Sequence, residues 1–276
     1  ATMTASSVNN HLTSTSPTSS RDPVTGQTWS IRTISSPLHS MIAIDSMQNK
    51  ITCHISNACA ACDTNEGVSN YCTLSEISIG PPSKTARHLH VEVFINDKSC
   101  AQLVLVYPSE NPNAMISDIG FILVRGQKRG FAPVLQYLEI YGGARVSPQA
   151  FKFSPMDVSN LFCKTYYKEI TRPLELTYST HEFSQAGLDK VTLTVPTSAL
   201  EALTFKENRN LLDVVNDFFM YEFRIDLGRF PVIKAANGVV VLGCDGRVKF
   251  LCHADAILSE IRVLLKENVR SDFICS

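Results

Sequence analysis

Residues 238–253 read GVVVLGCDGRVKFLCH, two apolar runs that flank an Asp-Gly pair. Asp-Gly between apolar runs is typical of a β-hairpin with a two-residue turn. Because neighbouring residues of a strand point to opposite sides, this turn assigns each side chain to a face. One face is predicted to carry two cations at its tip and apolar side chains at its base: Val240, Leu242, Arg247, Lys249 and Leu251. The other is predicted to be apolar throughout: Val239, Val241, Val248, Phe250 and Cys252.

The segment after the hairpin predicts a helix over residues 255–267. An apolar stripe runs along it at the spacing of an amphipathic helix, made of Ile257, Ile261, Leu264 and Leu265. This stripe fits the all-apolar face of the hairpin better than the mixed one. The face with Arg247 and Lys249 is therefore available for another contact.

The composition indicates a globular chain with a large core. The 276 residues are 44% hydrophobic and 18% charged, and a chain of this length buries roughly three quarters of its unfolded surface. The formal net charge is -1, so any contact with nucleic acid needs a local cluster of cations. No run of about 18 apolar residues occurs, so we expect no transmembrane helix.

Cysteine usage and the first residues favour a reducing compartment. The 9 cysteines are an odd number in a chain of this size, which suits free thiols better than a disulfide framework. Residues 1–20 have neither a cationic start nor an apolar segment, so we expect no secretory signal. The expected location is the cytoplasm or the nucleus.

Three segments are predicted along the chain. Residues 1–28 are rich in Ser, Thr and Asn and are expected to be a disordered tail. Residues 29–153 are expected to form an N-terminal α+β domain, and residues 154–276 a C-terminal α+β domain that carries a partner-binding sheet.

Alternating and helical patterns predict the elements of both domains. The first is expected to contain a strand from residue 29, a helix over 45–62, a hairpin of 87–95 with 99–107, a strand over 119–124 and a helix over 131–141. The second is expected to contain a helix over 155–170, strands over 174–179 and 189–195, helices over 198–205 and 210–223, and strands over 223–227 and 230–236. Hairpins with separate helices indicate an α+β fold of two units, with mostly antiparallel sheets packed by helices.

Most motifs of catalysis are absent. The chain has no GxxxxGK[ST], no GxGxxG that opens a helix, no HExxH and no GxSxG. These absences agree with a protein that has no enzymatic activity, no cofactor and no metal, whereas a catalytic site assembled from distant residues would leave no such motif. A basic loop flanked by glycines, RGQKRG at 125–130, could hold phosphates, although a solvated turn is the simpler interpretation.

Residues 53–72, CHISNACAACDTNEGVSNYC, are the strongest candidate for a metal site. Cys59 and Cys62 have the spacing of a zinc knuckle. Further ligands could come from Cys53, Cys72, His88 or His90. No second CxxC follows at ribbon spacing, and small buried cysteines are ordinary core residues. A small zinc-binding domain protein remains an alternative.

Segments spread along the chain resemble the centromere protein L family of the inner kinetochore. They are WSIRTISSPL at 29–38, FKFSPMDVSNLF at 151–162, FRIDLGRFPVIKAANGVVVLGCDGRVKFLCH at 223–253 and the closing apolar helix. The third is the most specific, because strand, Asp-Gly turn, basic-apolar strand, Cys-His and terminal helix come in the family's order. The resemblance covers residues 29–276, except that 59–113 do not match residue by residue.

The resemblance implies a non-enzymatic subunit of the constitutive centromere-associated network, located at the centromere and kinetochore in the nucleus. It implies a role in kinetochore assembly and chromosome segregation during cell division. The implied partner is centromere protein N, which would form a heterodimer with the C-terminal half of the chain. Other network subunits, the centromeric nucleosome and its DNA would lie beside this heterodimer, and a homodimer could form without the partner.

Two cations of the hairpin are the predicted DNA contact. Arg247 and Lys249 lie two residues apart and would project together towards phosphates, a contact that depends on salt and not on base sequence. Lys234 would join them only through a β-bulge, because a strict two-residue turn at Asn237-Gly238 places Lys234 on the covered face. The alternative is that these cations are solvated residues of an edge strand.

Three apolar residues of the same face are the predicted partner contact: Val240, Leu242 and Leu251. A partner would cover them by strand addition or sheet packing within residues 223–251. Two further alternatives are a stand-alone β-sheet module that binds nucleic acid without a partner and an enzyme whose titratable groups converge in a pocket from distant parts of the sequence.

Overall fold

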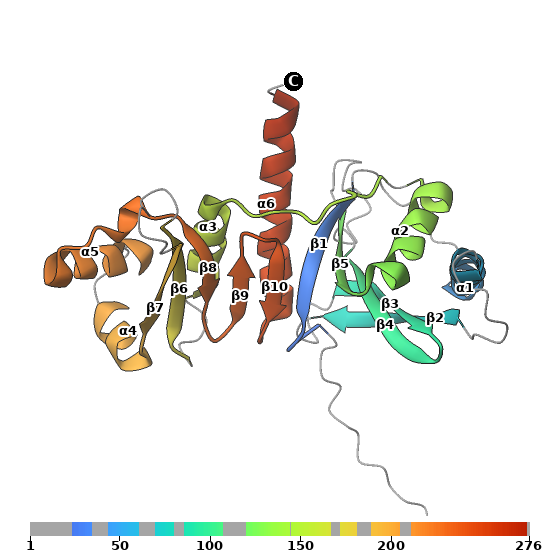
Figure 1. Ribbon diagram of the computed structural model, residues 1–276, viewed down its shortest axis with the longest axis horizontal. Coiled ribbons are helices and arrows are strands. Elements are labelled where there is room, and N and C mark those ends of the chain that lie inside the picture. Colours follow the sequence, from blue (N-terminus) through green and yellow to red (C-terminus); the bar gives the residue numbers. More distant parts are fainter. Residues whose placement is uncertain are drawn as a thin grey trace, which may run out of the picture.

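The chain folds around one long antiparallel sheet (Figure 1). The structure, a computed structural model, describes residues 24–34, 44–60, 70–79, 86–106, 120–143, 145–166, 172–180, 189–204 and 211–274. Within these ranges, ten strands are hydrogen-bonded in the order β2-β3-β4-β5-β1-β10-β9-β8-β6-β7. Their bounds are β1 Thr28–Ile34, β2 Asn70–Ile79, β3 Ala86–Ile95, β4 Lys98–Val106, β5 Gly120–Gly126, β6 Leu174–Ser179, β7 Lys190–Val195, β8 Val232–Ala236, β9 Val240–Gly243 and β10 Arg247–Phe250.

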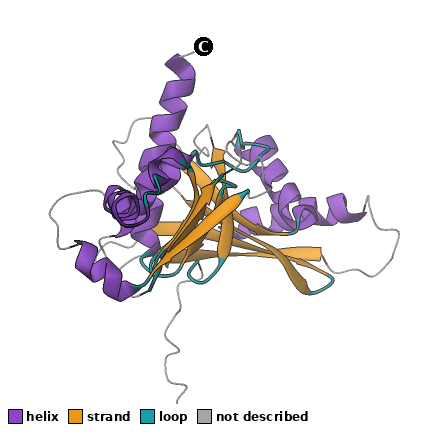
Figure 2. Cartoon of the chain, turned by 60° about the vertical axis from the view of Figure 1, so that its left-hand side comes forward, coloured by secondary structure: helices purple, strands orange, loops and turns teal. Residues whose placement is uncertain are grey.

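The helices lie on both sides of this sheet (Figure 2). Those described are α1 Ile44–Ala60, α2 Lys128–Gly142, α3 Pro155–Tyr166, α4 Thr197–Thr204, α5 Leu211–Phe223, the 3-10 helix η2 Leu227–Arg229 and α6 Ala254–Ile274. Antiparallel strands with separate helices confirm the predicted α+β class.

Strand β1 joins the two halves of the chain. It pairs with β5 of the first half, for example Ser30 with Val124, and with β10 of the second half, for example Ser30 with Arg247. The predicted domains at 29–153 and 154–276 therefore share one continuous sheet. Their helices pack against opposite faces of it.

The N-terminal boundary of the fold lies a few residues before the predicted one. Residues 1–23 of the expected tail lie outside the described residues. Val24 is fully buried, and its carbonyl accepts a hydrogen bond from Trp29 Nε1 at 3.1 Å. The Gly26 N–H donates to the Phe250 carbonyl at 2.7 Å. Residues 24–28 thus belong to the fold and hold the start of β1 against β10.

Two apolar cores lie on opposite faces of the sheet. In the first half, α1 and α2 cover one face through Ile51, Ile55, Val134 and Leu138. The opposite face is covered by α3 and α6 along the middle of the sheet, with α4 and α5 at the far end. The predicted stripe of α6 is confirmed, because Ile257, Ile261, Leu264 and Leu265 are all buried in this core.

The β9–β10 hairpin forms, but its predicted register is wrong by one residue. Leu242 pairs with Val248 and not with Lys249. The reason is a three-residue loop: the Gly246 N–H donates to the Gly243 carbonyl at 3.0 Å, and Gly246 has a left-handed φ of 80°. A turn followed by a left-handed residue is a common hairpin loop of this length.

This one-residue difference exchanges the two faces of β9. Val240 and Leu242 join Val248 and Phe250 in the core, and all four are fully buried. Arg247 and Lys249 point away from that core, as predicted.

Two other elements differ from the prediction. The strand expected over 223–227 is instead the end of α5, a loop and the start of η2. Arg224 takes a left-handed φ of 57°, which ends the helix, and Asp226 Oδ1 accepts a hydrogen bond from the Gly228 N–H at 3.2 Å. Strand β2 was not predicted, and it forms the edge of the sheet beside β3.

A buried histidine lies between the sheet and α6. His88 is 4% exposed, and its Nδ1 has no hydrogen-bond partner among the described residues. Burial, and secondarily the Arg262 guanidinium on α6, lowers the pKa of His88 to about 4. The ring is therefore neutral in the folded chain at neutral pH.

We predict that His88 makes the fold sensitive to acid. Its folded pKa of about 4 lies below the ordinary value of 6.5, so the unfolded chain binds the extra proton between these values. The free energy of unfolding should therefore fall by up to about 3 kcal/mol as pH decreases from 6.5 to 4. Urea unfolding across this range should show a shallower fall for His88→Gln than for His253→Gln, whose ring is exposed. Parallel curves would contradict the assignment.

We also predict that Gly246 is required for the hairpin loop. A Cβ there would press against the Phe151 carbonyl oxygen, whereas a Cβ at Gly26, also at φ 80°, would meet nothing within 4 Å. Gly26→Ala should cost about 1–2 kcal/mol through backbone strain alone. Gly246→Ala should cost about 1–3 kcal/mol more, because the clash adds to the strain. Urea unfolding of both variants measures the difference, and equal losses would refute the predicted clash.

Candidate nucleic-acid interface

The sheet has an open region on the face of β6–β10 opposite α3 and α6. In the described part of the chain no helix lies over this face, which looks towards the viewer in Figure 1. The strand residues that point to it are exposed or half-buried, whereas their neighbours in each strand are largely buried. We call this surface the open face.

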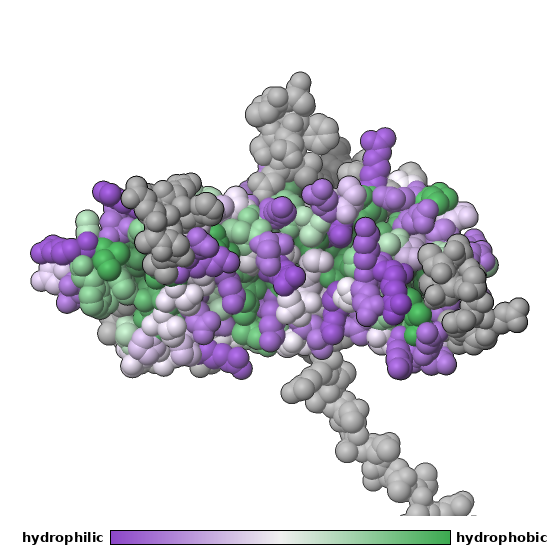
Figure 3. Space-filling model, in the orientation of Figure 1, coloured by the Kyte–Doolittle hydropathy of each residue, from purple (hydrophilic) through white to green (hydrophobic). Residues whose placement is uncertain are grey.

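Residue pairing sets the side chains of the open face in two rows. The first row runs across the strands as Thr192, Thr177, Lys234, Gly243, Arg247 and Ser30. The second runs as Thr194, Glu175, Ala236, Val241, Lys249 and Thr28. Small, polar and cationic side chains thus make up most of the surface, which is pale or hydrophilic in Figure 3.

The three cations predicted from the sequence share this face. Arg247 and Lys249 are two residues apart on β10, about 7 Å along the strand. Lys234 pairs with Gly243, which lies beside Arg247, so Lys234 is about 10 Å from Arg247 across β9. The sequence required a β-bulge for Lys234 to share this face, and a register shift does lie beside it, since Thr177 pairs with Lys234 but Tyr178 pairs with Val232. The register with β9 also differs from the prediction, because Lys234 pairs with Gly243 and not with Val241.

One carboxylate lies among these cations. The Asp245 side chain lies over Gly243, between Lys234 and Arg247, and its Oδ1 accepts a hydrogen bond from the Arg247 N–H at 3.1 Å. Asp245 Oδ2 lies 3.5 Å from Arg247 Nε, but both side chains are largely exposed, at 60% and 73%. An exposed ion pair of this kind is weak and gives way readily to another anion.

The chemistry of the open face suits phosphate better than bases. Among the described residues of β6–β10, the face carries Lys190, Lys234, Arg247 and Lys249 against the carboxylates Glu175 and Asp245. None of the side chains in its two rows is aromatic, so bases have no ring on which to stack. Cations without stacking partners favour contacts to a phosphate backbone.

The cations of the basic loop predicted at 125–130 lie on different faces of the sheet. Arg125 lies over the Trp29 ring at 5.8 Å, on the side of α6. Lys128 and Arg129 are exposed in the first turn of α2. Gly126 ends β5, which is next to β1 in the sheet, so these two cations extend the basic region beyond Thr28.

The three residues predicted to contact a partner do not form an exposed surface together. Val240 and Leu242 are fully buried by the chain's own core, so they cannot serve as an exposed partner contact in this fold. Leu251 is half-buried at the end of the hairpin. Strands β8, β9 and β10 each have a neighbour on both sides, which leaves no free edge there for strand addition. The edges of the described sheet are β2 and β7.

The residues of the zinc hypothesis do not converge where they are described. Cys53 is exposed on α1, whereas Cys72 is buried on β2 with its Sγ 3.4 Å from Thr52 Oγ1. The Cys59 side chain and Cys62 lie outside the described residues. The described part of the chain contains no group of three potential metal ligands.

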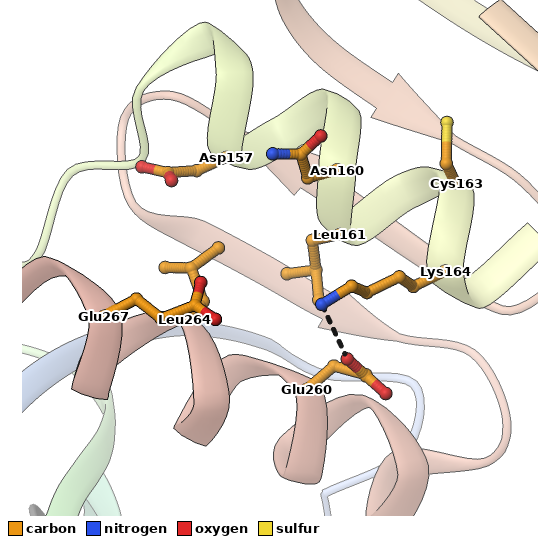
Figure 4. Close-up of a pocket in the computed structure, with 8 residues that line it drawn as sticks. All are labelled: Asp157, Asn160, Leu161, Cys163, Lys164, Glu260, Leu264 and Glu267. Carbon is orange, nitrogen blue, oxygen red and sulfur yellow. Dashed lines mark ion pairs between the residues drawn. The ribbon is translucent and has the colours of Figure 1, made fainter. Parts of the chain in front are cut away.

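A hollow of about 230 Å³ between α3 and α6 was not predicted from the sequence (Figure 4). Its lining is mixed: Asp157, Asn160, Leu161, Cys163, Lys164, Glu260, Leu264 and Glu267. Lys164 Nζ pairs with Glu260 Oε2 at 3.4 Å, and the Cys163 thiol points away from these charges. The Cys163 thiol therefore lies apart from this ion pair.

The alternation of β6 and β7 is the signal that could have located the open face. LELTYS and DKVTLTV place a polar residue at every second position, which marks a solvated side of a strand. This pattern predicts the strands and also marks which of their sides faces solvent.

No helix in the described part of the chain is long and apolar enough to span a membrane.

Comparison with known proteins does not assign the chain to a family. No protein-family model matches the chain, and no curated protein matches it.

Proposed function

We propose that the chain is a non-enzymatic scaffold subunit of the inner kinetochore, similar to centromere protein L, which holds DNA phosphates on the open face of its sheet. The observation that carries the DNA contact is the shared placement of Lys234, Arg247 and Lys249 on that face. The kinetochore assignment is supported by the sequence resemblance over residues 29–276. In this proposal the protein acts in the nucleus, at the centromere.

The proposed contact is to the DNA backbone. Cations in two neighbouring rows can neutralise several phosphates at once, and each neutralised phosphate releases counterions. The threonines around them can donate further hydrogen bonds to phosphate oxygens. Such a surface holds DNA of any sequence, which suits a scaffold.

The proposed partner is centromere protein N. Because β8–β10 are enclosed within the sheet, a strand of the partner would have to add at β7, the edge of the C-terminal half. This edge is exposed along most of its length. It borders the open face, so a partner there would extend the same surface.

A stand-alone nucleic-acid-binding module is the second candidate function. The observation that favours it is the excess of cations on the open face, where Lys190, Lys234, Arg247 and Lys249 stand against Glu175 and Asp245. Binding by the isolated chain with the same affinity as the heterodimer would support this alternative.

We predict that the double variant Arg247→Ala/Lys249→Ala binds DNA more weakly. Loss of two phosphate contacts should reduce the slope of log K against log salt by about 2. Titration of labelled duplex DNA between low and moderate salt measures the slope. The control is Lys50→Ala/Lys98→Ala, which removes the same charge from exposed positions of the other half. An unchanged slope in the first variant would exclude these residues as contacts.

We predict a 1:1 heterodimer with centromere protein N of the same organism. Co-expression followed by light scattering on a sizing column measures the stoichiometry. Failure to associate, with the isolated chain monomeric and well behaved, would contradict the kinetochore assignment. It would leave the DNA titration as an independent test of the open face.

A further inference from the structure

The last two turns of α5 carry the largest apolar side chains exposed at this end of the molecule. Exposure is 41% for Phe218, 75% for Tyr221 and 57% for Phe223, and Ile225 just after the helix is 46% exposed. Figure 3 shows hydrophobic surface here, at the left-hand end over α5. We call these residues, with Met220, the α5 patch.

The patch exists because α5 extends beyond the core. Its first turns bury Leu211, Leu212 and Val215, whereas nearly all residues from 217 onward are exposed. Five of the seven residues from 217 to 223 are apolar or aromatic, and apolar surface on a helix is normally buried. In the described part of the chain, most of these side chains remain exposed.

Ring contacts hold the patch in shape. The centroids of Phe219 and Phe223 are 5.2 Å apart, those of Phe218 and Phe219 5.7 Å, and those of Phe218 and Phe223 6.2 Å. These are the separations of packed aromatic pairs. The patch is therefore a preformed surface.

Carboxylates surround the patch. Asp213 and Asp217 precede Tyr221 at four-residue spacing on the solvent side of α5, and Glu222 lies within the patch. Arg224 is the one cation between residues 211 and 225. An occupant with apolar residues and flanking cations would complement both the surface and its charge.

The exposed area of the α5 patch suits a small binding partner. The exposed parts of its five side chains amount to on the order of 500 Å², below the roughly 800 Å² per partner of a standard protein interface. A second copy of the chain in a two-fold dimer would set the same carboxylates against each other. A single helix of another protein avoids both problems.

We propose that the α5 patch docks an amphipathic helix of another protein, apolar on one side and rich in Lys and Arg on its flanks. The apolar side lies across the rings in the manner of a helix bound to a hydrophobic surface. The cations face Asp213, Asp217 and Glu222. The patch lies apart from the open face, so the inference does not rest on the proposed function.

The test uses the full chain and a fluorescent 18-residue helical peptide. The peptide carries Leu at every third or fourth position and Lys at the flanking positions, and the control peptide replaces each Lys with Glu. The Lys peptide should bind with a Kd on the order of 10 μM, at least ten-fold more tightly than the Glu peptide. Tyr221→Ser/Phe223→Ser should weaken it at least ten-fold.

A charge reversal makes the test specific. Asp213→Lys/Glu222→Lys should lose affinity for the Lys peptide and gain affinity for the Glu peptide. All four substituted residues are exposed, and unfolding midpoints and duplex DNA binding by each variant serve as controls for folding and for the open face.

Three results would overturn the proposal. The first is that the Lys peptide does not bind at concentrations up to 1 mM. The second is that both peptides bind the unsubstituted chain equally. The third is that the Tyr221→Ser/Phe223→Ser variant binds the Lys peptide as tightly as the unsubstituted chain. A concentration-dependent dimer that this variant abolishes would replace the proposed helix with a second copy of the chain.

Discussion

The pairing of β1 with β10 is the contact on which the rest of the structure depends. It joins a strand from the start of the fold to one near its end, so the hydrogen bonds of ten described strands form one sheet. Val24 and Trp29 anchor this junction in the core beneath α6. Without the junction, each half would present a central strand edge to solvent, with its backbone N–H and C=O groups unpaired.

The helices cover the two faces of this long sheet to different extents. The first half is covered by α1 and α2 on one side and, along β1, β5 and part of β4, by the core of α6 on the other. The second half is covered by α3 and α6 on one side only. The uncovered side must be polar to remain stable in water, which explains its threonines and cations. The candidate function thus follows from an unequal distribution of helices.

The polar and the apolar exposed surfaces lie in different places and attract different partners. The open face offers cations without rings, a combination suited to phosphates. The α5 patch offers rings among carboxylates, a combination suited to a basic amphipathic helix. The net charge of -1 does not report this separation of opposite charges, because the cations of one surface and the carboxylates of the other cancel in the sum. A scaffold that contacts DNA and proteins at once needs this kind of separation.

Local patterns in the sequence were enough to predict the α+β class, the hairpin, the buried stripe of α6 and the outward direction of Arg247 and Lys249. Each of these depends on residues close together in the chain, where the periods of 2 and 3.6 residues act. The register of β9 was decided by tertiary structure, since the left-handed Gly246 lies against Phe151, a residue of the segment before α3. The same holds for the burial of Val240 and Leu242, for the place of Lys234 on the open face and for the union of two halves in one sheet. Alternation along a strand says that two faces exist, but only contacts between distant segments decide which face is covered.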